Sequence, residues 1–188
     1  MNNYLKLIAI LCFTITCNAQ VELITRNKES YTKDVFDYKG VRVLFIDEVN
    51  LENEKNVFIF SKVEKNANPD VMYLQRFQKS NNKWTTKTVF EIKHKGIISG
   101  WASRKAFVDY DKDKSVDAFF IFALYDADFK QETVNLVFSK KDKFYTIESK
   151  VSDGFSTNQF SENFKDLDEN TKSNIMEYWN GLDKEDNN

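Results

Sequence analysis

The residues best suited to specific chemistry in this chain are four aspartates within one short segment. Asp109, Asp111, Asp113 and Asp117 occupy positions 1, 3, 5 and 9 of that segment. Alternate residues of a tight loop can point inward together, and a hard cation such as Ca²⁺ is held by several oxygen ligands. The spacing therefore predicts a calcium site with these four carboxylates as ligands.

The second half of a standard calcium loop is missing. An EF-hand has glycine at position 6 and a bidentate glutamate at position 12, whereas this segment has Lys114 and Phe120 there. A lysine in the left-handed conformation costs about 1 kcal/mol or more relative to glycine, so we expect a looser bend and a weak site. The alternative is a solvated turn in which Lys112 and Lys114 balance the acidic charge in place of a metal.

Few other residues suggest chemistry. His94 is the single histidine, and no catalytic residue can be assigned from a nucleophile or metalloprotease motif. Asp and Glu residues could still form a glycosidase pair in space. Trp101 follows the most glycine-containing connection, so it is our candidate ligand-binding residue, because loops often carry function. The alternative for Trp101, as for Trp84 and Trp179, is packing in a β core.

The elements that must position these residues read mainly as β-strands, because short apolar or alternating runs are separated by polar turns. We expect an antiparallel meander of about eight strands. Val57–Phe60 and Ala118–Leu124 are apolar throughout, which predicts central strands buried on both faces. Val71–Gln78 and Thr133–Ser139 mix apolar and polar residues, so one face of each is expected to meet water.

The C-terminal segment changes to a helical period. Leu167 to Asn180 is expected to form an amphipathic α-helix packed on the sheet, with Asp166 or Asp168 at its start and Gly181 just past its end. Its predicted sheet-facing residues are Ile175, Tyr178 and Trp179.

The N-terminus has the pattern of a secretory signal peptide. A short charged region is followed by the apolar run Leu7–Ile15 and by small residues up to Ala19. We therefore expect residues 1–19 to be removed, leaving residues 20–188 as a single β-rich domain without a transmembrane span, exported to the periplasm, cell surface or medium. Lipid attachment at Cys17, as in an envelope lipoprotein, is the alternative.

The amino-acid composition limits the classes of molecule that the protein is expected to bind. The formal net charge is −2 over 188 residues, and a mildly acidic chain does not attract phosphate backbones, so no nucleic-acid partner is expected. Both cysteines, Cys12 and Cys17, precede the predicted cleavage point. The mature domain would therefore contain no disulfide and would depend on packing of its many aromatic residues.

The second half of the chain combines four features: the segments Ala106–Phe122, Val134–Ser139 and Phe144–Ile147, and a terminal helix ending in Trp179. In this order they resemble a family of exported Bacteroidetes-type proteins labelled "surface polysaccharide biosynthesis protein". The resemblance implies a role in making or displaying cell-surface polysaccharide. Lys114 departs from the family pattern, which has glycine in the aspartate-rich turn.

Our leading functional hypothesis is a non-enzymatic exported domain that binds a cell-surface glycan or an envelope protein, with a weak calcium site. The alternatives are a glycan-active enzyme that uses an Asp/Glu pair and a structural envelope lipoprotein. Two carboxylates about 5 to 9.5 Å apart in a cleft would favour the enzyme.

Overall fold

The computed structural model describes residues 21–24, 28–52 and 54–185, and the predicted signal peptide lies outside them. It confirms a mainly β, antiparallel fold with one C-terminal α-helix. The strands form two five-stranded sheets in place of a single meander of about eight strands. The first sheet has the order β1 (Glu22–Ile24), β2 (Arg42–Leu51), β3 (Glu54–Lys62), β4 (Asp70–Ser80), β5 (Lys83–His94). The second has the order β10 (Gln159–Phe160), β9 (Lys143–Lys150), β8 (Gln131–Lys140), β7 (Asp117–Tyr125), β6 (Ile97–Val108).

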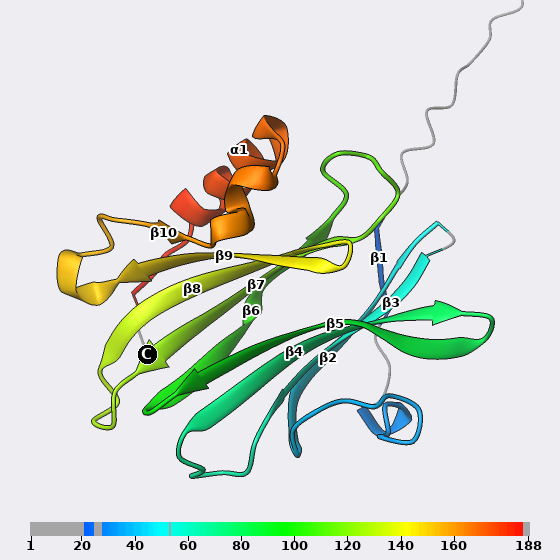
Figure 1. Cartoon of the computed structure of the whole chain (residues 1–188), viewed down its shortest axis with the longest axis horizontal. Coiled ribbons are helices and arrows are strands. Elements are labelled where there is room, and N and C mark those ends of the chain that lie inside the picture. Colours follow the sequence, from blue (N-terminus) through cyan, green and yellow to red (C-terminus); the bar gives the residue numbers. More distant parts are fainter. Residues whose placement is uncertain (1–20, 25–27, 53, 186–188) are drawn as a thin grey trace, which may run out of the picture.

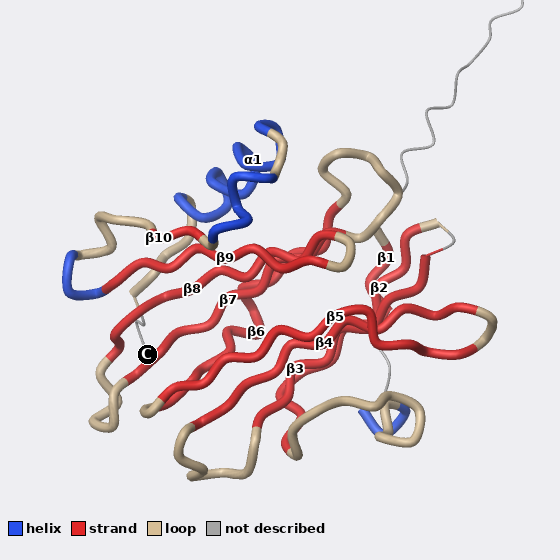
Figure 2. Tube along the Cα trace, in the orientation of Figure 1, coloured by secondary structure: helices blue, strands red, loops and turns tan. Residues whose placement is uncertain are grey.

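The two sheets lie face to face as the layers of a sandwich, with α1 (Glu169–Asn180) on the outside of the second sheet (Figure 1). Neighbouring strands in each sheet are also neighbours in the sequence, so each half of the chain forms its own meander. Figure 2 shows the strands making up both layers, joined by loops at their ends. Three short 3₁₀-helices complete the fold: η1 (Lys28–Ser30), η2 (Val151–Asp153) and η3 (Glu162–Asp166).

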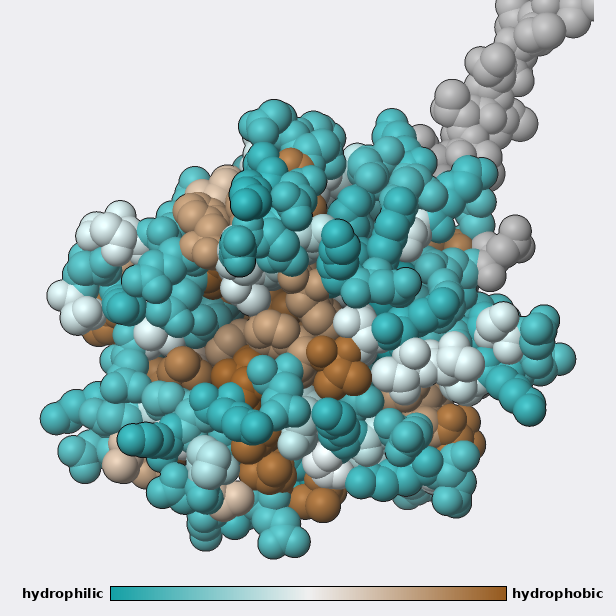
Figure 3. Space-filling view, viewed as in Figure 1, coloured by the Kyte–Doolittle hydropathy of each residue, from teal (hydrophilic) through white to brown (hydrophobic). Residues whose placement is uncertain are grey.

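A phenylalanine-rich core fills the space between the sheets. The ring of Phe120 on β7 lies 5.3 Å from that of Phe58 and 4.8 Å from that of Phe60, both on β3. Apolar side chains also gather between the layers on the face shown in Figure 3. On one side of the sandwich, Phe90 of β5 contacts Phe144 of β9, with 5.5 Å between ring centroids. As predicted, the apolar strands β3 and β7 are central and buried.

The helix covers the outer face of the second sheet. Ile175 and Trp179 are fully buried there, and Tyr178 packs beside them, as the helical period predicts. Asp168 caps the helix by accepting a hydrogen bond from the Thr171 backbone N–H at 2.9 Å, and Gly181 follows its last turn. Trp179 donates its indole N–H to Asn158 at 2.8 Å, which satisfies its polar group in the core.

The prediction that one face of β4 and one face of β8 meet water is wrong, because a third and a fourth layer cover them. Tyr31 and Phe36 pack on the outer face of the first sheet with Phe77 of β4. Gln75 is buried beneath this segment and accepts a hydrogen bond from the Lys39 backbone N–H at 2.5 Å. On β8, α1 provides the equivalent cover. Gln75 is therefore hydrogen-bonded to the segment that covers it, and Asn135 on β8 donates a hydrogen bond to the Thr133 hydroxyl at 2.8 Å.

Candidate functional site

The four aspartates lie in the loop between β6 and β7, here called the aspartate loop (residues 109–117). Asp109 closes it by accepting hydrogen bonds from the backbone N–H groups of Asp113 at 3.0 Å and Lys114 at 3.1 Å. Asp113 accepts one from the Ser115 backbone at 2.9 Å. Lys114 has φ +67°, so the chain makes the tight left-handed bend of a calcium loop without glycine. The expectation of a looser bend is wrong.

The acidic charge is balanced by Lys140 and Lys141, in place of the expected Lys112 and Lys114. Lys140, at the end of β8, places its Nζ 2.6 Å from Asp111 Oδ2 and 3.4 Å from Asp117 Oδ2. Lys141 pairs with Asp113 at 2.9 Å. Lys114, by contrast, turns away and pairs with Glu52 at 3.2 Å. Counter-charge therefore comes from the neighbouring β8–β9 turn, which the sheet register brings beside the loop.

Asp117 is the most unusual of the four. Its side chain is fully buried, and its Oδ1 has no hydrogen-bond partner among the described residues. Burial raises the pKa of Asp117 to about 7, and Lys140 opposes that rise. Phe120, at the position where an EF-hand has its glutamate, is also buried in the core between the sheets, so it offers no ligand.

Residues of the first sheet hold the loop in place. Glu54 on β3 accepts a hydrogen bond from the Val116 backbone N–H at 2.8 Å and pairs with Arg76 at 3.1 Å. The Arg76 guanidinium is buried and donates to the backbone oxygen of Lys141 at 2.6 Å. Both segments that carry the acidic and basic side chains are thus attached to the opposite sheet.

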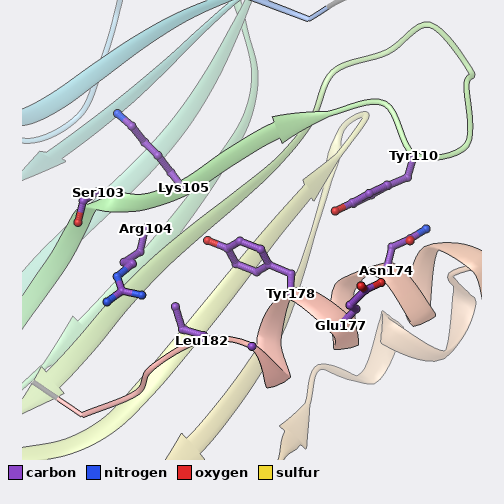
Figure 4. A pocket seen from close by; sticks show the side chains of 9 residues that line it. Ser103, Arg104, Lys105, Tyr110, Asn174, Glu177, Tyr178 and Leu182 are labelled. Atoms are coloured by element: carbon purple, nitrogen blue, oxygen red, sulfur yellow. The ribbon is translucent and has the colours of Figure 1, made fainter.

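A cleft of about 590 Å³ opens next to the aspartate loop, between β6 and α1 (Figure 4). Its lining residues come from three segments: Ser103, Arg104 and Lys105 from β6; Tyr110 from the loop; Asn174, Glu177, Tyr178, Gly181 and Leu182 from the helix and its end. Figure 4 shows both tyrosine side chains reaching into the space between strand and helix. Aromatic rings with a few polar groups are typical of a small-ligand site.

An irregularity in β6 creates the strand side of this cleft. Its pairing with β7 shifts between Gly100 and Lys105, where four residues on β6 face a single residue, Ile121, on β7. Such a bulge turns side chains out of the regular alternation. Ser103 and Arg104 are therefore exposed at the cleft, whereas Lys105 points toward the first sheet and lies 2.5 Å from Asp47.

The cleft combines rigid rings with one unpaired cation. Tyr178 stacks on Phe119 with ring centroids 4.8 Å apart, and Tyr110 meets the same ring edge-on at 5.7 Å. Burial raises the pKa of Tyr178, which Arg104 opposes. Arg104 has no ion pair or hydrogen bond within the described part of the chain. Its guanidinium is thus free to bind an anionic or hydroxyl-rich ligand.

Sequence reasoning did not identify this cleft. Trp101, the predicted ligand-binding residue, is half-buried and packs on the core beneath the helix, and it is not among the lining residues. Trp84 packs against Phe36, with ring centroids 5.1 Å apart. The position of Tyr110 could have been predicted in part from the sequence. The aspartates at odd-numbered positions of the loop turn inward, so the side chain of an even-numbered residue such as Tyr110 is expected to point out of the loop. The sequence contains no such indication for the helix residues, because Tyr178 belongs to the helical repeat of residues that face the sheet and was therefore expected in the core.

Comparisons of this chain with family models, with curated proteins and with solved structures found no match. Among the described residues, no helix is long and apolar enough to cross a membrane.

Proposed function

We propose that this protein is an exported, non-catalytic β-sandwich domain that binds a cell-surface glycan through the cleft between β6 and α1. The observation that carries the proposal is the composition of the cleft, in which Tyr110 and Tyr178 stand beside Arg104, Asn174 and Glu177. Sugar rings pack against aromatic rings, and their hydroxyl groups need donors and acceptors such as these side chains.

The same composition favours binding over hydrolysis. A glycosidase of the usual kind needs two carboxyl groups about 5 to 9.5 Å apart across the scissile bond. Glu177 is the only acidic side chain among the residues that line the cleft. The four aspartates of the neighbouring loop do not line the cleft, and they are engaged with Lys140, Lys141 and backbone N–H groups.

Two features of the sequence support the cellular setting. The N-terminal pattern predicts export, and the resemblance of the second half to surface polysaccharide proteins implies work on glycans at the envelope. An envelope protein that displays such a glycan is the corresponding macromolecular partner.

The proposal is tested by titrating the purified protein with neutral and uronic-acid-containing oligosaccharides and recording amide chemical shifts. We expect shifts at Tyr110, Asn174 and Tyr178, and a loss of affinity of about fivefold or more in Asn174→Ala and Arg104→Ala. Asn170→Ala, on the same helix but outside the cleft, and Lys87→Ala, on β5, are the matched controls. Absence of shifts at millimolar sugar, or shifts confined to another surface, would refute the proposal.

Hydrolysis is measured in the same samples. Release of new reducing ends by the wild type, with loss of that release in Glu177→Gln, would replace the binding function with an enzymatic one.

A further inference from the structure

We propose that Asp109, Asp111, Asp113 and Asp117 form a binding site for Ca²⁺, and that the ammonium group of Lys140 competes with the metal ion for it. The first three carboxylates each offer an oxygen, and these oxygens lie within 4.8 Å of one another. Lys140 Nζ lies among the acids, 2.6 Å from Asp111, 3.4 Å from Asp117 and 3.9 Å from Asp113. Its ammonium group marks a position where several carboxylate oxygens converge on a cation.

Asp117 adds a carboxylate from outside this group of three. The carboxylate of Asp117 is fully buried, its Oδ2 faces Lys140, and its Oδ1 has no hydrogen-bond partner among the described residues. Leaving a buried charged oxygen unpaired is costly. A single ammonium group at 3.4 Å reaches only one of the two oxygens, whereas a metal ion can be bound by both oxygens of a carboxylate.

The charge at the site also favours a divalent ion. Four carboxylates are opposed by Lys140 and by Lys141, which pairs with Asp113 at 2.9 Å. The carboxylates at the site therefore outnumber the two ammonium groups paired with them. Calcium accepts six to eight oxygen ligands in irregular geometry, whereas Mg²⁺ demands a near-ideal octahedron. Carboxylates from a loop and from a strand end, completed by water, suit calcium better.

Binding requires little rearrangement of the backbone. Glu54 and Arg76 attach the loop and the β8–β9 turn to the first sheet through the Val116 N–H and the Lys141 carbonyl. The Lys140 side chain is long and 12% exposed, so its ammonium group has to rotate outward when a metal ion displaces it. The cost of that displacement sets the affinity of the wild-type site.

The test uses Tb³⁺ luminescence sensitised by Tyr110 in the loop, with Ca²⁺ as the competing ion. We expect saturable Tb³⁺ binding that Ca²⁺ reverses, an affinity at least about tenfold higher in Lys140→Met, and at least about tenfold lower in Asp111→Asn. Asp128→Asn, an exposed aspartate in the β7–β8 turn, is the matched control and should behave as the wild type.

Each outcome bears on the proposal. No saturable signal in either the wild type or Lys140→Met would overturn the site, and equal affinities in these two proteins would overturn the competition. If circular dichroism shows that Lys140→Met does not fold, Lys140→Gln replaces it, and the comparison of wild type with Asp111→Asn still decides whether the carboxylates bind the ion.

Discussion

At the scale of single residues, Lys114 has a strained backbone conformation that a substitution by glycine would relieve. Its φ of +67° lies in the left-handed region, where a side chain costs about 1 kcal/mol or more relative to glycine. Its one ion pair among the described residues, with Glu52, is exposed and contributes little. We therefore expect Lys114→Gly to raise the free energy of unfolding by about 0.5 to 1 kcal/mol, measured by urea denaturation.

The matched variant is Lys114→Ala, which loses the same ion pair but keeps a Cβ atom in the left-handed bend. A gain in Lys114→Ala as large as that in Lys114→Gly would show that backbone strain is not the cause.

At the scale of elements, α1 depends on the cap at its first turn. Asp168 accepts a hydrogen bond from the Thr171 N–H, and the Thr171 side chain together with this backbone group holds the pKa of Asp168 below its usual range. Replacing such a cap by alanine costs about 1 kcal/mol. We expect that loss in Asp168→Ala at pH 7, measured by urea denaturation.

The pH dependence of the cap follows from its lowered pKa. The folded protein binds the Asp168 proton less tightly than the unfolded chain, so the stabilisation is complete above the unfolded pKa of about 4. It is lost as the pH falls through the lower folded value. Asp168→Asn retains a cap without charge. The difference in free energy of unfolding between this variant and the wild type should therefore be smaller at pH 3 than at pH 7. A difference that is constant from pH 7 to pH 3 would contradict this account.

At the scale of the whole molecule, the pair of Glu54 and Arg76 joins the two sheets at the end that carries the aspartate loop. Arg76 is almost fully buried, and Glu54 also holds the Val116 backbone. Removing one member of a buried ion pair leaves the other charge without compensation, at a cost of about 3 to 5 kcal/mol. We expect a loss of about 3 kcal/mol in Glu54→Ala, measured by thermal and chemical denaturation.

The neighbouring variant Glu52→Ala is the control. Within the described part of the chain Glu52 forms an ion pair with the exposed Lys114 alone, so this substitution should cost less than about 1 kcal/mol. Equal losses in the two variants would mean that the pair contributes no specific link between the sheets.

Local pattern was sufficient for part of this fold. The apolar runs on β3 and β7 predicted two buried central strands, and the helical period with Asp168 and Gly181 predicted α1 and the side that faces the sheet. These features depend on the alternation of nearby side chains, which a single segment carries by itself. The division into two sheets was not predicted, because antiparallel pairing partners are chosen by packing across the whole domain.

By itself, the sequence determined that this chain is mainly β, that it ends in a capped amphipathic helix, and that one loop concentrates four aspartates. Tertiary structure decided which cation meets those aspartates, since Lys140 comes from a hairpin about thirty residues away and is brought there by the pairing of β7 with β8. It also created the cleft, because Arg104, Tyr110 and Tyr178 share no local pattern and meet only where the bulge of β6 lies opposite α1. Side chains distant in the sequence become neighbours only through the packing of whole elements.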